Sequence, residues 1–138
     1  DMITDVAALA DIRQSWEGAR MLRLRVQRGL VGVVGAGAGT SVLLADIAHN
    51  LPFLHACSVL NDTLEQLRDE GVFRSKKRTL GALVDASTGS LLWLDRTAID
   101  RMVIDRNALA HDGAVLARAT CWQYIALIEQ QLGAWSVV

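Results

Sequence analysis

The stretch LHACSVLNDTLEQLRDEG, residues 54–71, decides the fold class. Its apolar side chains recur at the three-and-four spacing of one face of an α-helix, at Leu54, Cys57, Leu60, Leu64 and Leu67. Pro52 lies just ahead of them and ends, kinks or restarts a helical region that begins near residue 41, because proline lacks an amide donor and clashes with the preceding turn. Gly71 supplies a stop signal. The pattern predicts a long core helix.

The same spacing recurs on both sides of this stretch. One predicted helix runs from Val6 to about Gly29, a short one covers 80–86, and another runs from residue 91 or 95 to His111, where Asp112 and Gly113 break it. The last predicted helix carries a seam of Ala114, Ala117, Cys121, Ile125, Ile128, Leu132 and Trp135. No stretch alternates as a strand would. We therefore expect an all-α fold, an antiparallel helical bundle of four main helices plus a short helix.

Length and composition fit one globular domain covering residues 1–138. The chain is 51% hydrophobic and 21% charged, which excludes a disordered protein. Its net charge of -1 excludes a global basic field, so any phosphate contact has to be local. The mean hydropathy of +0.26 is high for a small domain and favours a buried interface with a second copy or a partner. Core or interface anchors are expected at Trp16, Trp93, Trp122 and Trp135.

A glycine-rich run covers residues 29–39. It resembles a phosphate-cradling loop only loosely, since no lysine follows the last glycine and no βαβ pattern surrounds it, so we expect a loop. The longest uncharged run, residues 29–45, borders on the length of a membrane helix, but its glycines make it a poor one. The N-terminus shows no basic-then-apolar signal segment. The expectation is a cytoplasmic protein with no membrane association.

Cysteine and histidine positions give no sign of a metal centre. Cys57 and Cys121 each fall on the apolar stripe of a predicted helix, which favours core thiols over a disulfide. His49 and His55 flank Pro52 at a spacing that no common metal site uses. We expect neither a metal nor a cofactor.

The end of the penultimate predicted helix carries the polar residues of most interest. Arg106 falls in the middle of an apolar stripe, and a guanidinium cannot lose its proton, so it needs a carboxylate, backbone carbonyls or a phosphate as its partner. Asn107 and His111 project together from a neighbouring face of the same helix. These residues leave two interpretations open: a core ion pair with a helix-end histidine, or a site that grips a phosphate.

The run Arg106-Asn107-Ala108-Leu109-Ala110-His111 resembles the Arg-x(4 to 6)-His element of HEPN domains, in which a polar residue often follows the arginine. The order of predicted helices over roughly residues 45–135 is also similar to the layout of that family. The resemblance implies metal-independent RNA cleavage at a homodimer interface. It implies that His111 acts as general base or acid, Arg106 holds the phosphate, and Asn107 orients the histidine or the RNA.

A basic segment lies between two predicted helices and consists of Arg74, Lys76, Lys77 and Arg78. It is either a solvated loop or a patch that guides RNA. The hypothesis is thus a HEPN-like endoribonuclease of the toxin or defence type, with RNA as substrate and a cognate antitoxin as a candidate partner. The alternative is a non-catalytic helical module that binds a nucleotide or RNA, dimerises, or docks a partner protein.

Overall fold

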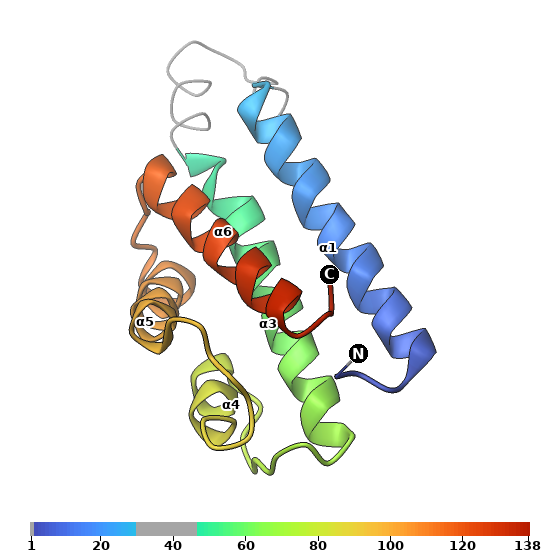
Figure 1. Cartoon of the computed structure of the whole chain (residues 1–138). Helices are drawn as coiled ribbons and strands as arrows, with labels where there is room; N and C mark the ends of the chain where they lie inside the picture. The colour runs from blue at the N-terminus through green and yellow to red at the C-terminus, as the bar shows by residue number, and fades with distance from the viewer. Residues whose placement is uncertain (1, 30–46) are drawn as a thin grey trace.

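The structure is a computed structural model that describes residues 2–29 and 47–138. Within these ranges every regular element is a helix, which confirms the predicted all-α class: α1 (Val6–Gln27), α3 (Asn50–Asp69), α4 (Leu80–Ala86), α5 (Arg96–Asp112) and α6 (Arg118–Ala134). In Figure 1, α1 lies on one side, α4 and α5 lie on the other, and α3 and α6 run between them. None of the described helices is long and apolar enough to cross a membrane. The glycine-rich run falls almost entirely outside the described residues.

Helix α3 forms the centre of the core, as its periodicity predicted. Phe53, Leu60, Leu64 and Leu67 are completely buried, and each of the other described helices contributes apolar side chains to the same cluster. Pro52 lies in the first turn of α3, where the absence of an amide donor removes no helical hydrogen bond. Proline therefore restarts the chain as a helix rather than kinking it.

Local capping sets the helix ends. Asp5 caps α1 and Asp95 caps α5 by accepting hydrogen bonds of 3.0 Å from the backbone amides of Ala8 and Ala98, respectively. Each cap contributes less to stability than a core contact does, but it fixes where its helix begins. Gly113 ends α5 with a left-handed φ of 68°, a conformation that costs glycine little. The predicted bounds of these helices are confirmed to within a residue or two.

The predicted start of the last helix is wrong. Ala114 and Ala117 are exposed, and α6 begins only at Arg118. The chain after Gly113 is held extended instead, because the side-chain oxygen of Asn50 accepts a 3.1 Å hydrogen bond from the backbone amide of Leu116. The three-and-four spacing of apolar residues continued by chance into this linker, whose backbone is hydrogen-bonded to α3.

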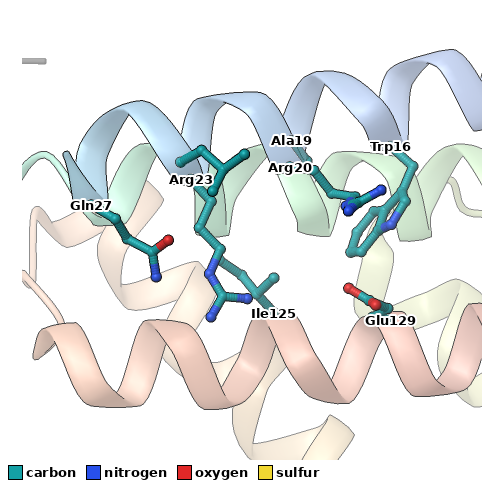
Figure 2. Close-up of a pocket in the computed structure, with 8 residues that line it drawn as sticks. Trp16, Ala19, Arg20, Arg23, Gln27, Ile125 and Glu129 are labelled. Atoms are coloured by element: carbon teal, nitrogen blue, oxygen red, sulfur yellow. The ribbon is translucent and has the colours of Figure 1, made fainter. Parts of the chain in front are cut away.

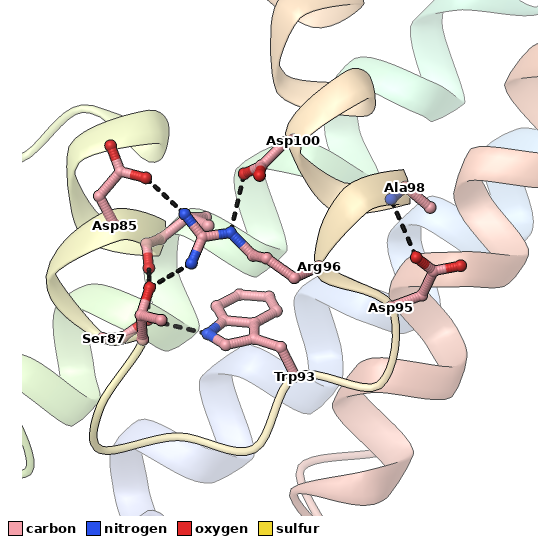
Figure 3. Close-up of polar contacts among 9 residues, drawn as sticks. Asp85, Ser87, Trp93, Asp95, Arg96, Ala98 and Asp100 are labelled. Carbon is pink, nitrogen blue, oxygen red and sulfur yellow. Dashed lines mark hydrogen bonds and ion pairs between the residues drawn. The ribbon is translucent and has the colours of Figure 1, made fainter.

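Helices α1 and α6 both pack against α3, and their facing side chains leave a groove between them (Figure 2). At the other side of the molecule, Arg96 braces α4 against α5 (Figure 3). Its guanidinium pairs with Asp85 of α4 and, at 2.8 Å, with Asp100 of α5. The indole of Trp93 donates a 3.1 Å hydrogen bond to Ser87 beside this brace. These contacts hold α4 against α5.

Candidate functional site

A groove of about 470 Å³ opens between α3, the start of α4 and the second half of α5. The residues that line it are Cys57, Ser58, Asn61, Arg78, Thr79, Leu80, Gly81, Arg106, Asn107 and His111. All three residues of the motif at the end of α5 thus border one cavity. One of the four basic residues of the 74–78 segment joins them.

Arg106 is half-buried in this groove without an acidic partner. Its Nη1 donates a 3.1 Å hydrogen bond to Oδ1 of Asn107, whereas its Nε is buried and has no hydrogen-bond partner in the described part of the chain. No carboxylate of residues 2–29 or 47–138 forms an ion pair with it. A core ion pair is therefore not what holds this guanidinium, and donors remain for an anionic ligand.

The lining of the groove is locally positive. It contains the guanidinium groups of Arg78 and Arg106 and the imidazole of His111, but no aspartate or glutamate. A concave surface lined by charges of one sign concentrates counter-ions. The overall charge of -1 therefore conceals a local site suited to an anion.

His111 lies in the last turn of α5 and is exposed. It makes no hydrogen bond to any other described residue, so its ring is open to a ligand in the groove. Imidazole is the side chain best suited to move a proton near neutral pH. Because it lines the groove and is exposed, His111 lies at the rim rather than on the floor.

Cys57 belongs to the floor of the groove and is chemically inert. Burial raises the pKa of its thiol to about 12, even though the charge of Arg106 acts in the opposite direction. The thiol is therefore protonated at neutral pH and cannot serve as a nucleophile. Cys121 is also a buried free thiol, which confirms the prediction that both cysteines pack in the core.

Sequence reasoning missed the wall that α3 contributes. Ser58 and Asn61 face the groove one helical turn apart, along the edge of the apolar stripe of α3. Their three-residue spacing was the available signal, but polar pairs of this kind are common on solvated helix faces. Gly81 forms part of the opposite wall, where a Cβ atom would lie 3.4 Å from Val103 of α5.

The basic segment divides in two. Arg78 lines the groove, whereas Arg74, Lys76 and Lys77 are exposed and lie outside it. The hydroxyl of Ser75 donates a 2.8 Å hydrogen bond to the carbonyl of Lys77, which ties the segment into a local turn. Only its last residue therefore belongs to the candidate site.

Comparison with protein-family models, curated proteins and solved structures gives no match for this chain. The described residues contain no group of three or more His, Cys, Asp or Glu side chains that could hold a metal ion. The resemblance to HEPN domains therefore rests on features of the sequence alone.

Proposed function

We propose that this protein is a HEPN-like, metal-independent endoribonuclease of the toxin or defence-effector type, acting at a homodimer cleft. The observation that carries the proposal is that Arg106, Asn107 and His111 line one groove together with Arg78 and without any carboxylate. The proposal includes the arrangement of α1, α3, α5 and α6 as the four main helices of an antiparallel bundle, with α4 as the short helix.

The chemistry follows from the side chains available. The ribose 2'-hydroxyl attacks phosphorus, the bond from phosphorus to the 5'-oxygen breaks, and a 2',3'-cyclic phosphate and a 5'-hydroxyl form. One imidazole accepts the proton of the 2'-hydroxyl, and another group delivers a proton to the leaving oxygen. The unpaired donors of Arg106, aided by Arg78, bind the phosphate oxygens as charge builds on them.

A second copy of the chain supplies what one copy lacks. Arg106 and His111 project from α5 about 140° apart, given 100° per residue, so one helix converges poorly on one phosphate. A single imidazole also cannot accept and donate a proton at the same moment. Two motifs that meet across a two-fold axis would provide two imidazoles, one as base and one as acid.

Cleavage of single-stranded RNA in the presence of EDTA tests this function. We expect the wild type to cut RNA and to leave cyclic phosphate ends, and we expect His111→Ala and Arg106→Ala to abolish cutting while helicity measured by circular dichroism stays unchanged. Lys76→Ala is the matched control, because Lys76 is basic but exposed outside the groove. Inactivity of the wild type against RNAs of varied sequence and structure contradicts the proposal.

A second candidate is a non-catalytic module that binds RNA or a nucleotide. It is favoured by one observation: no described residue hydrogen-bonds to the ring of His111, whereas catalytic histidines are usually oriented by a third group. This candidate predicts that the wild type binds RNA without cutting it and that Arg106→Ala weakens binding. If the protein is a toxin, we expect a cognate antitoxin to cover the groove.

A further inference from the structure

A second groove runs between α1 and α6, away from the candidate site (Figure 2). It consists of two adjoining hollows of about 270 and 460 Å³ that share Arg23 and Glu129. Trp16 and Ala19 of α1 and Ile125 of α6 form its buried apolar floor. In Figure 1, α3 and α6 separate α1 from α4 and α5, so a ligand here would leave the α3/α4/α5 groove open.

Arg23 is the polar anchor of this second groove. Its guanidinium lies 5.1 Å from the ring centroid of Trp122, and this stacking fixes the planar group in place. Its Nε is buried without a hydrogen-bond partner, and no described carboxylate forms an ion pair with it, including that of Glu129 in the same groove. A stacked guanidinium with unused donors is suited to bind a carboxylate.

The surroundings of Arg23 favour a polypeptide over a nucleic acid. Leu24 is 41% exposed at the edge of the groove, and Val138 is 39% exposed at its far end, so apolar surface is available to a partner. Glu129 in the opposite wall disfavours a ligand that is negatively charged along its whole length, such as a nucleic-acid backbone, whereas a helix can confine its acidic side chains to the edge that faces Arg23. On α1, Arg20 and Arg23 line the groove, and Arg20 is paired with Glu17 of the same helix, so Arg23 is the arginine left to bind an acidic side chain of a partner.

We propose that the α1/α6 groove docks an amphipathic helix of a partner protein, with the apolar face of that helix on Leu24 and Ile125 and its acidic edge along α1 at Arg23. The stretch of α1 that borders the groove, residues 16–27, is about 17 Å long at 1.5 Å per residue, which matches roughly three turns of a docked helix. Recognition of an apolar stripe by a groove between two helices is a common mode of peptide binding. This inference does not depend on the proposed nuclease activity.

Two synthetic helical peptides test the charge complementarity. Both carry the same leucines at positions i, i+3, i+4 and i+7, and they differ only in having glutamate or lysine along one edge. Titration followed by calorimetry is expected to show the glutamate peptide binding about tenfold more tightly than the lysine peptide. Arg23→Glu is expected to reverse that preference.

Two further variants keep the test independent of folding defects. Arg25→Glu places the same charge change on α1 outside the residues that line the groove, and it is expected to keep the preference of the wild type. Leu24→Gln alters an exposed side chain and is expected to weaken binding of both peptides while circular dichroism stays unchanged.

Four outcomes overturn the proposal. The first is equal binding of the two peptides, and the second is no binding of either at about 1 mM, a concentration that detects even weak complexes. The third is displacement of the glutamate peptide by a single-stranded RNA oligonucleotide, which would assign the groove to nucleic acid. The fourth is a homodimer that Arg23→Glu dissociates, which would assign the groove to a second copy of this chain.

Discussion

Asn107 accepts a 3.1 Å hydrogen bond at Oδ1 from Nη1 of Arg106, its neighbour in sequence. The guanidinium lines the α3/α4/α5 groove, and this contact is the single hydrogen bond that it makes to described residues. A planar group held at one nitrogen keeps its remaining donors for a ligand. The pair therefore leaves the donors that the proposed phosphate binding requires.

Replacement of Arg106 by methionine is expected to remove RNA cleavage without loss of stability. The buried Nε has no partner, and an unsatisfied buried donor costs about 1 kcal/mol or more, so its removal should leave the free energy of unfolding unchanged or raise it. Urea denaturation and an RNA cleavage assay measure the two effects. Arg101→Met, at an exposed position of the same helix, serves as the control. A large fall in stability for Arg106→Met alone would mean that Arg106 holds the core together.

Arg96→Ala is expected to destabilise the protein by about 1 kcal/mol, because exposed ion pairs contribute little individually but Arg96 joins two carboxylates and a hydroxyl across α4 and α5. Urea denaturation measures the change. Arg20→Ala is the matched control, since Arg20 forms one exposed ion pair with Glu17 within α1 and its loss should be close to neutral. Equal effects of the two substitutions would show that the brace adds nothing beyond a surface pair.

Gly113→Ala is expected to lower the free energy of unfolding by about 1 kcal/mol, because the φ of 68° at this position is unfavourable for a residue with a Cβ atom. Gly133→Ala provides the opposite case, since Gly133 lies in α6 with no atom within 4 Å of a built Cβ. It is expected to stabilise the helix by up to about 1 kcal/mol. Thermal unfolding of both variants measures whether stability falls for Gly113→Ala and rises for Gly133→Ala. Destabilisation by Gly133→Ala would contradict the second expectation.

Stability is expected to fall at alkaline pH. Burial raises the pKa of Cys57 to about 12, and burial together with the hydrogen bond to Asp105 raises the pKa of Tyr124 to about 12, compared with 9.0 and 10.0 for the free side chains. The folded protein therefore retains these protons at a pH where the unfolded chain releases them. The resulting stabilisation is complete below about pH 9 and is lost as pH rises toward 12.

Urea denaturation at several values between about pH 8 and pH 11 measures this decline. The double variant Cys57→Ala and Tyr124→Phe lacks both groups and is expected to show a flatter profile over the same range. A decline as steep in the double variant as in the wild type would assign the alkaline sensitivity to other groups.

The sequence alone determined the helices and most of their ends. Periodicity and helix-breaking residues are local properties, so Gly113 after α5 and Gly71 after α3 marked these ends without knowledge of the fold. The start of α5 was left open between residues 91 and 95, and the structure identifies Asp95 as its cap. Local reasoning failed after Gly113, where the backbone amide of Leu116 donates a hydrogen bond to the side-chain oxygen of Asn50 and the linker stays outside the last helix. A contact between residues 66 positions apart leaves no trace in a three-and-four spacing.

The candidate site divides in the same way. The motif at the end of α5 was visible in the sequence because Arg106, Asn107 and His111 fall within six consecutive residues. Only the tertiary structure decided that Ser58 and Asn61 form the facing wall and that Arg78 alone, of four basic neighbours, joins the groove. The side chains that meet across a groove depend on the angles at which helices cross and on the contacts of Arg96 that hold α4 against α5. The whole core sets these packing geometries, and no single stretch of chain does so.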